Sequence, residues 1–355
     1  MEKKYVIITG SDGLVGSECV EYYCQQGFKV IGIDNNSRKK FFGNDASTLW
    51  NRNRILQKYK NFKHYNIDIN NKNKTEKIFK DLGSKIKLII HAAAQPSHDW
   101  AAKNPEIDFK VNALGTLNLL ENFRNYSQNA VFIFTSTNKV YGDTPNNIDF
   151  IEKNLRYEVP EQSMYFNGID ENMSIDNSLH SLFGVSKLSA DLMTQEYGKY
   201  FGLKTIVFRG GCLTGPNHSG TLMHGFLSYL VKCFVEGKEY KIFGYKGKQV
   251  RDNIHSYDLV NAFDFAFSNP KFGEVYNIGG SRISNCSILE AINILESISS
   301  KKLNYEILNK ARTGDHKWYI SNISKFKNDN PDWEITYSIE DTIFEIYKSQ
   351  LGYLS

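Results

Sequence analysis

Three glycines, Gly10, Gly13 and Gly16, form a G-x-x-G-x-x-G motif after a short apolar run and at the start of a helical pattern. Without a Cβ atom, such residues let the chain turn tightly and approach a phosphate, while the amides that open a helix face the anion. Asp34 ends the next apolar run, 18 residues after Gly16. A ribose-binding acid is expected about 20 residues after such a motif. Together these residues predict a dinucleotide site.

The residues near Asp34 indicate which dinucleotide binds. A carboxylate accepts hydrogen bonds from ribose hydroxyls and repels a 2′-phosphate, so Asp34 favours NAD over NADP. Arg38 weakens this preference if it binds phosphate, but it also fits a solvated basic loop with Lys39 and Lys40. The NAD contacts expected in this region are Gly10, Gly13, Leu14, Gly16, Asp34, Asn35 and Arg38.

The elements that must position these residues alternate between strands and helices. Short, continuous apolar runs are typical of a parallel sheet with helices on both faces, which predicts a doubly wound, Rossmann-like α/β fold. The expected strands cover residues 5–9, 28–34, 62–67, 86–91, 130–135, 204–208 and 275–278. The expected helices cover residues 14–26, 75–82, 107–126, 182–201, 222–236 and 288–299.

Two regions are expected along the chain. Residues 1–210 carry most of the alternating pattern and form the predicted NAD-binding domain, whereas residues 211–355 form a smaller substrate-binding lobe, with the strand at 275–278 returning to the main sheet. Residues 142–181 show little periodicity and many Asn and Asp side chains. Loops of this length in compact domains are usually functional or disordered.

Composition excludes several classes of protein. A net charge of +4 over 355 residues is too small an imbalance to indicate nucleic-acid or membrane-surface binding. The five cysteines are scattered and contain no C-x-x-C pair, which is typical of reduced cytoplasmic thiols. No apolar run approaches the roughly 18 residues of a membrane span. We therefore expect a cytoplasmic protein, and we assign no metal site.

Further motifs resemble the extended short-chain dehydrogenase/reductase superfamily, especially its nucleotide-sugar epimerases. Asp68-Ile69 resembles its adenine-contacting pair, and the sequence HAAAQ from His91 resembles the segment that passes the pyrophosphate and nicotinamide ribose. Residues 111–116 resemble its V-N-x-x-G-T helix. The resemblance implies further NAD contacts at Asp68, Ile69, Ala92, Ala94, Asn112 and Lys187.

The same resemblance implies where a sugar nucleotide binds. The sequence FIFTSTNKVYG at 132–142 resembles the strand that presents the active-site hydroxyl, here Thr137, and QVRD at 249–252 resembles the segment whose Arg251 holds a diphosphate. The run STNKVYGD at 136–143 is similar to that of CDP-sugar 2-epimerases, which favours a CDP-sugar as substrate. The expected substrate contacts are Gln95, Thr137, Asn138, Cys212, Arg251 and Arg312.

One position departs from the family pattern. The superfamily uses Y-x-x-x-K on a helix, where Lys lowers the pKa of the Tyr, but this chain has Phe183 before Lys187. Phenylalanine has no proton to exchange. Three explanations remain open: an engineered variant, a natural enzyme with a relocated base, or a binding protein without turnover. The candidate replacement groups are Tyr165, Asp170, Glu171, His180 and Tyr141.

The resulting functional hypothesis is an NAD-dependent nucleotide-sugar epimerase that oxidises its substrate to a keto-sugar and reduces it again on the opposite face. Asn138-Lys139 cannot supply the Asp-Glu pair of sugar 4,6-dehydratases, which argues against dehydration. The alternatives are an inactive NAD or nucleotide-sugar binding protein, and a decarboxylase or keto-reductase of the superfamily. The resemblance also implies a homodimer, formed by the helices at 107–126 and 182–201.

Overall fold

A seven-stranded sheet forms the centre of the first part of the molecule. The structure is a computed structural model that describes residues 4–222, 224–312 and 314–352 of the chain. The strand order is β12-β8-β5-β4-β1-β2-β3, and the pairs from β3 to β5 are parallel. The predicted doubly wound sheet is therefore confirmed. Its strands are β1 (Tyr5–Thr9), β2 (Lys29–Ile33), β3 (Phe62–Tyr65), β4 (Ile86–His91), β5 (Val131–Thr137), β8 (Thr205–Gly210) and β12 (Glu274–Ile278).

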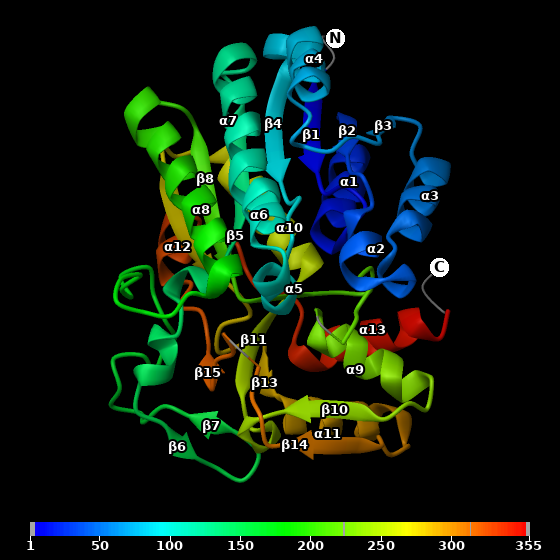
Figure 1. The fold of residues 1–355 in the computed structure, drawn as a ribbon, viewed down its shortest axis with the longest axis vertical. Coiled ribbons are helices and arrows are strands. Elements are labelled where there is room, and N and C mark those ends of the chain that lie inside the picture. Colours follow the sequence, from blue (N-terminus) through cyan, green and yellow to red (C-terminus); the bar gives the residue numbers. More distant parts are fainter. Residues whose placement is uncertain (1–3, 223, 313, 353–355) are drawn as a thin grey trace. The chain divides into compact units, whose positions relative to one another are not determined.

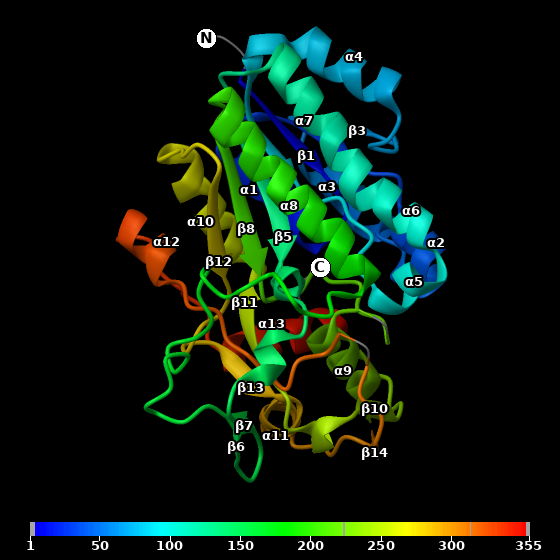
Figure 2. The same ribbon diagram turned by 60° about the vertical axis from the view of Figure 1, so that its left-hand side comes forward.

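Helices cover both faces of this sheet (Figures 1 and 2). On one face, the hydroxyl of Tyr22 donates to Asp264 at 3.1 Å; on the other, the hydroxyl of Tyr197 donates to Glu121 at 2.5 Å. The first face carries α1 (Leu14–Gln25), α3 (Leu49–Lys58) and α10 (Ser256–Ser268). The second face carries α4 (Lys72–Leu82), α7 (Gly115–Tyr126) and α8 (Ser181–Phe201).

The core explains why the strands read as continuous apolar runs. Ile7, Ile89 and Phe132, on three neighbouring strands, are all fully buried. Full burial of each such side chain contributes about 1.5–3 kcal/mol relative to exposure. In the parallel register, Thr9 lies opposite both Ile33 and His91, so that β1, β2 and β4 end at the same edge of the sheet. The segments that follow these strands are brought together there.

The helix expected at residues 107–126 is interrupted. It consists of α6 (Pro105–Phe109), a π-helical turn, η3 (Lys110–Leu114), and α7. Within this turn the Asn112 side chain is buried and hydrogen-bonded to Gln95 and Asp108. Such π-turns occur mostly as single turns within α-helices and frequently mark functional sites. Periodicity could not reveal the interruption, because the residues on both sides keep the helical apolar pattern.

Other boundaries differ by a few residues. α4 begins at Lys72, three residues before the expected start, because the side chain of Asn71 caps it by accepting from the Lys74 amide at 3.1 Å. The helix expected at 222–236 is α9 (Phe226–Val235), and Met223 lies outside the described residues. The short helices α2 (Ser37–Phe42) and α5 (His98–Lys103) were not predicted because their apolar patterns are too short to show a period. The helices α3, α10, α12 (Ser324–Asp329) and α13 (Ile339–Gln350) were also not predicted.

The chain divides into two compact units. The first contains residues 1–137, 182–209 and 260–276, and the second contains 138–181, 210–259 and 277–355. Besides the boundary expected at residue 210 and the expected return of the chain near residue 275, the chain also passes between the units after residues 137 and 181. Among the described residues, no helix combines the length and the hydropathy needed to cross a membrane.

The second unit has its own sheets and core. Leu230, Ile292 and Ile343, on three different helices, are among its fully or almost fully buried side chains. Its helices are α9, α11 (Ile288–Ser299), α12 (Ser324–Asp329) and α13 (Ile339–Gln350). Its strands are β9 (Cys212–Thr214), β11 (Val250–His255), β13 (Asn285–Ser287) and β15 (Trp318–Tyr319) in one sheet, β10 (Tyr240–Phe243) with β14 (Tyr305–Leu308), and β6 (Ile151–Glu152) with β7 (Tyr157–Glu158).

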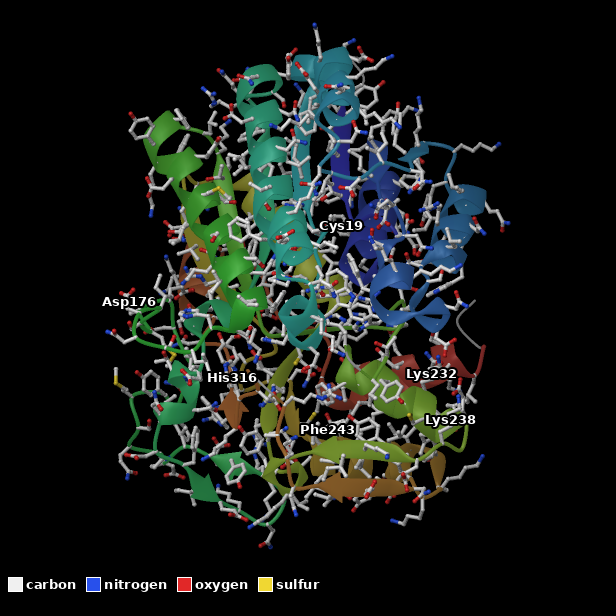
Figure 3. The ribbon with its side chains drawn as sticks, viewed as in Figure 1. Cys19, Asp176, Lys232, Lys238, Phe243 and His316 are labelled. Carbon is white, nitrogen blue, oxygen red and sulfur yellow. The ribbon has the colours of Figure 1, made fainter. Side chains whose placement is uncertain are left out.

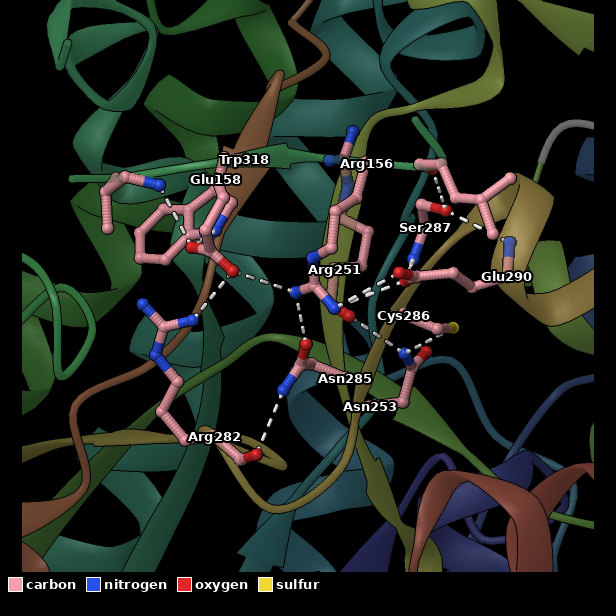
Figure 4. Close-up of polar contacts among 12 residues, drawn as sticks. Arg156, Glu158, Arg251, Asn253, Arg282, Asn285, Cys286, Ser287, Glu290 and Trp318 are labelled. Atoms are coloured by element: carbon pink, nitrogen blue, oxygen red, sulfur yellow. Dashed lines mark hydrogen bonds and ion pairs between the residues drawn. The ribbon is translucent and has the colours of Figure 1, made fainter. Parts of the chain in front are cut away.

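Charged side chains order part of the long stretch at residues 142–181. Arg156, just before β7, donates to Asn285 at 2.6 Å and forms an ion pair with Glu290 at 3.2 Å (Figure 4). Glu158 of β7 accepts from Arg282 at 2.9 Å and from the Trp318 indole at 3.0 Å. Because these groups are at least half-buried, their ion pairs are less screened than those of a solvated loop.

A buried ion pair joins three elements of the first unit. Arg209 on β8 donates twice to Asp191 on α8, each time at 3.0 Å, and both side chains are at most 5% exposed. The hydroxyl of Ser136 on β5 donates to the same carboxylate at 2.6 Å. Because the ions are removed from water, the loss of either one leaves an uncompensated buried charge.

We expect Asp191→Ala to lower the free energy of unfolding by about 3–5 kcal/mol, since Arg209 would lose its buried carboxylate. Urea denaturation followed by circular dichroism measures this change. Glu236→Ala is the matched control, because it breaks an exposed pair with Lys238 and should cost less than about 1 kcal/mol. Equal effects of the two substitutions would contradict the assigned role of the buried pair.

Candidate functional site

The glycine-rich turn after β1 has no room for side chains at two positions. Gly10 has φ +70°, and a Cβ atom there would lie 2.8 Å from the backbone of Ala92. A Cβ atom at Gly16 would lie 2.0 Å from the carbonyl oxygen of Gly10. The Ser17 amide donates to the Gly13 carbonyl at 2.8 Å, which begins α1 directly after the turn. The arrangement is a compact backbone cradle at a helix N-terminus.

Asp34 lies beside this cradle, directly after β2. Its carboxylate accepts from the Asn36 amide at 2.7 Å and from the Asp12 amide at 3.2 Å. Burial, reinforced by the negative charge of Asp12, raises the pKa of Asp34 to about 6. The side-chain amide of Asn35 donates to the carboxylate of Asp68 at 3.3 Å. Three predicted NAD contacts, Asp34, Asn35 and Asp68, therefore lie together.

Asp12, inside the glycine motif, belongs to a buried network that sequence reasoning missed. Its carboxylate pairs with Arg52 at 2.6 Å and with His64 at 3.2 Å, and its carbonyl accepts from Asn51 at 3.0 Å. These contacts fix the position of Asp12 within the turn. No local signal identifies them, because they follow Asp12 by about 40–50 residues on α3 and β3.

The Arg38 side chain packs against another residue of its own helix, α2. Its guanidinium lies over the Phe42 ring, 5.2 Å from the centroid. Burial lowers the pKa of Arg38 to about 10, against the opposing attraction of Asp34. The structure thus places a cation near the predicted ribose-binding carboxylate.

A chain of hydrogen bonds fixes the end of β4. The hydroxyl of Thr9 and ring nitrogen Nδ1 of His91 are 2.7 Å apart, and Nε2 is 2.9 Å from the Thr116 hydroxyl. Thr116 donates to the Asn112 carbonyl at 2.6 Å, so its oxygen accepts from His91 Nε2. Burial and the nearby Lys187 lower the pKa of His91 to about 3, which keeps the ring neutral.

A second buried network holds the segment that follows β4. The Asn112 side chain accepts from the Gln95 amide at 2.9 Å and donates to the Ser186 hydroxyl at 3.0 Å. Asp108 accepts from the Gln95 side chain at 2.6 Å and from Asn112 at 3.1 Å. We call Gln95, Asp108, Asn112 and Ser186 the amide network. Gln95, predicted to contact substrate, has its side-chain amide group bonded within this network.

Phe183 and Lys187 lie on the first two turns of α8. Both are almost fully buried. Lys187 donates to the Thr135 carbonyl at 2.7 Å and lies 4.1 Å from the centre of the Phe134 ring. Burial lowers the pKa of Lys187 to about 7, against the attraction of Asp191 and Asp108. Thr137 ends β5, the strand that carries the acceptor of Lys187.

The ring of His98 lies against that of Phe183. Their centroids are 5.0 Å apart and their planes meet at 71°, an edge-to-face contact. His98 opens α5, only three residues after Gln95. Sequence reasoning did not include it, because nothing in the sequence indicates that residues 98 and 183 meet.

The second unit contains a separate cluster of charges around Asp315. This carboxylate pairs with Arg251 and accepts from the His316 amide at 3.1 Å. Lys139 donates to the Gly314 carbonyl at 2.9 Å and lies 3.3 Å from Nδ1 of His316, which is labelled in Figure 3. Burial and the nearby Arg251 lower the pKa of Lys139 to about 8. Burial alone would raise the pKa of Asp315, but the cations outweigh it and lower it.

Two other predicted substrate contacts lie in the same unit. Arg312 stacks over the Phe243 ring at 4.2 Å and donates to the Leu222 carbonyl at 2.6 Å. Its charge contributes to the lowered pKa of Asp315. Cys212 lies on β9, where burial raises the pKa of its thiol to about 12. A thiolate nucleophile is therefore disfavoured at this position.

The candidate replacement bases all lie in the second unit, and most of them have structural partners. Tyr141 donates to the Asn277 side chain at 2.8 Å, and Glu171 accepts from the Asn277 amide at 2.5 Å. Nε2 of His180 lies 2.8 Å from the Val140 carbonyl. Asp170 accepts from the Asn172 amide at 3.0 Å. Tyr165 is half-buried.

The predicted site residues thus fall into two groups. The first unit holds the predicted NAD contacts together with Gln95, Thr137 and Phe183, and the second unit holds Asn138, Tyr165, Cys212, Arg251 and Arg312. Within the first group, Leu14 and Ile69 are buried, whereas Ala92 and Ala94 are half-buried. Asn138 is buried in the 3₁₀ turn that follows β5.

Comparison with known proteins places this arrangement among enzymes. The model of the family described as "Epimerase: NAD dependent epimerase/dehydratase family" matches residues 6–279. CDP-paratose 2-epimerase of Salmonella typhi is 33% identical over 350 residues, covering 96% of this chain and 98% of the relative. UDP-glucuronate 4-epimerase of Thermodesulfobacterium geofontis is 30% identical over 341 residues, covering 95% and 93%.

A solved structure shows the same fold. It is a tyrosine-to-phenylalanine mutant of UDP-glucuronic acid 4-epimerase from Bacillus cereus, in complex with UDP-4-deoxy-4-fluoro-glucuronic acid and NAD. Its TM-score is 0.78 at 25% identity, and the match covers 98% of this chain and 99% of the other. The likeness therefore extends over both units.

The buried Lys187 predicts a pH-dependent stability. In the unfolded chain the amine holds its proton up to about pH 10.5, but in the folded protein only to about pH 7. The unfolded state binds more protons between these values, so raising the pH favours folding. Relative to Lys187→Met, the wild type should gain up to about 1.4 kcal/mol per pH unit, measured by urea denaturation from about pH 7 to 9. A difference that does not change with pH would contradict this.

Proposed function

Because the chain belongs to the NAD dependent epimerase/dehydratase family, we propose that it is an NAD-dependent nucleotide-sugar epimerase. The observation that carries the finer proposal, a CDP-sugar 2-epimerase, is the 33% identity to CDP-paratose 2-epimerase over nearly the full length of both chains. The sequence GKQVRD, which contains Arg251, supports the same assignment.

The first unit fits an NAD molecule. The cradle at Gly10 and Gly16 leaves backbone amides at a helix N-terminus for a pyrophosphate. The carboxylate of Asp34 would bind the hydroxyls of the adenosine ribose. The Lys187 amine would bind the hydroxyls of the nicotinamide ribose. When bound, NAD supplies a reversible hydride acceptor. The protein supplies the position, the exclusion of water and the proton acceptor.

The second unit fits the diphosphate of a nucleotide sugar. Three cations, Lys139, Arg251 and Arg312, surround the carboxylate of Asp315. An arginine fork matches phosphate oxygens bidentately, and a buried positive excess attracts a diphosphate. Asp315 holds Arg251 in place when no phosphate is bound. Lys139 also stands where an acid would be needed for elimination of water, which disfavours a dehydratase.

A direct assay tests the proposed activity. We expect the purified protein to release NAD on denaturation and to convert a CDP-linked hexose or deoxyhexose into its C2 epimer, followed by the H2 and anomeric proton signals in NMR. The absorbance of NADH should show no net change, because each turnover returns the hydride. Lys187→Met should lose most of this activity. UDP-, GDP- and dTDP-sugars are the comparison substrates.

Two results would contradict the assignment. Net oxidation of added NADH would favour a reductase, and saturable binding of unchanged sugars would favour a binding protein without turnover. The absence of both NAD release and NAD uptake would remove the basis of the whole proposal.

We also propose that the protein is a homodimer. An apolar hollow of about 430 Å³ lies between α6, η3 and the start of α8. Four of its lining side chains are 41–49% exposed, Phe109, Leu114, Leu182 and Val185. Contiguous exposed apolar side chains of this kind favour contact with another protein surface. A second copy of the same face is the simplest closed partner.

In analytical ultracentrifugation, the wild type should sediment as a dimer and Leu114→Glu as a monomer, because a charge would be buried in the contact. Leu56→Glu is the control: Leu56 is 44% exposed on α3, on the opposite face of the sheet, and the dimer should persist. A monomeric wild type would exclude the homodimer.

The five thiols support a cytoplasmic location as a further proposal. All five cysteines are free, and four of them are buried. Proteins with unpaired buried thiols suit a compartment that keeps cysteine reduced.

A further inference from the structure

We propose that His98 is the catalytic base that replaces the tyrosine missing at position 183. This inference rests on the function proposed above and adds a residue that the family motif does not contain. It starts from the contact between the two rings, whose centroids are 5.0 Å apart.

The position of His98 suits this role. Its imidazole contacts the same ring from which the hydroxyl of a tyrosine at position 183 would project. His98 is half-buried, so the ring is partly protected from water yet remains accessible. Imidazole has an ordinary pKa of about 6.5, and histidine is the side chain that most often transfers protons in enzymes.

The amide network supports the backbone beside both residues. The Ser97 amide, next to His98, donates to the Gln95 side chain at 2.6 Å, and the Ser186 hydroxyl donates to the Phe183 carbonyl at 3.0 Å. Because Asn112 hydrogen-bonds to both Gln95 and Ser186, one buried network fixes the backbone at positions 97 and 183. Catalytic groups require this kind of fixed geometry.

The other proton acceptors of the first unit are less suitable. The Lys187 amine is already engaged, because it donates to the Thr135 carbonyl at 2.7 Å and lies over the Phe134 ring. His91 is fully buried, with both ring nitrogens within 2.9 Å of threonine hydroxyls. Asp108 is almost fully buried, and its Oδ1 accepts from both Gln95 and Asn112.

The proposed proton transfer balances over one catalytic cycle. A ring nitrogen of His98 would accept the proton that the sugar hydroxyl loses when the carbinol is oxidised to a ketone, and bound NAD would supply the acceptor for the hydride that leaves the carbon. The imidazolium of His98 would return this proton to the ketone oxygen when the hydride comes back to the opposite face of the carbon.

His98→Phe tests the proposal, because it preserves the edge-to-face packing and removes the titratable nitrogens. With the CDP-sugar that the wild type epimerises, we expect kcat to fall about 100- to 10,000-fold. The NAD content and the affinity for the nucleotide sugar should stay within about threefold, as measured by extraction and calorimetry. Asp99→Asn, an exposed neighbour on α5, is the control and should retain kcat within about twofold.

A second measurement does not depend on turnover. In protein labelled with ¹⁵N-histidine, a ring-nitrogen signal that is absent from His98→Phe should shift when the CDP-sugar is added. A kcat of His98→Phe within threefold of the wild type would overturn the role of His98. If the wild type turns over no sugar, the proposed function fails. In that case, a His98 ring-nitrogen signal that does not shift when the CDP-sugar is added would separately reject the role of His98.

Discussion

The amide network is the constraint on which the site of the first unit depends. Its four side chains are buried, and a buried amide or carboxylate without a partner would cost about 1–3 kcal/mol or more. The segment after β4, the π-helical turn η3 and the start of α8 therefore have to adopt a mutually consistent geometry. The apolar core fixes where the helices lie, but these hydrogen bonds fix the orientation of the residues at the edge of the sheet.

Much of the fold was predictable because periodicity reports burial. The strands of the main sheet and the helix at 288–299 were found from apolar runs and 3.6-residue patterns, and the glycine motif with Asp34 indicated the dinucleotide site. The interruption at η3 was not predictable, since a single inserted residue leaves the apolar pattern on both sides intact. The contacts of Asp12 with Arg52 and of His98 with Phe183 were also missed. The first contact joins residues that are 40 positions apart in the sequence, and the second joins residues that are 85 positions apart. Contacts over such separations depend on the tertiary structure.

The two units contribute different chemistry. The first provides neutral or weakly charged groups at the end of a parallel sheet: His91 is neutral, and burial lowers the pKa of Lys187. The second places three cations, Lys139, Arg251 and Arg312, around the carboxylate of Asp315. A site for proton and hydride transfer favours the first environment, and a site for a diphosphate favours the second. From the sequence, Arg251 was predicted by its motif, whereas Lys139 was noted only as the absence of an acid.

The π-helical turn has a consequence for how this chain is compared with its relatives. Each residue of an α-helix advances the side-chain direction by about 100°, so removal of one residue between Lys110 and Leu114 would turn Asn112 away from Gln95 while leaving α7 helical. An alignment that places an ungapped α-helix over η3 would then equate residues that face different directions. Homologues should therefore be aligned by the residue that occupies the inward position of Asn112, with a one-residue gap permitted on either side of it.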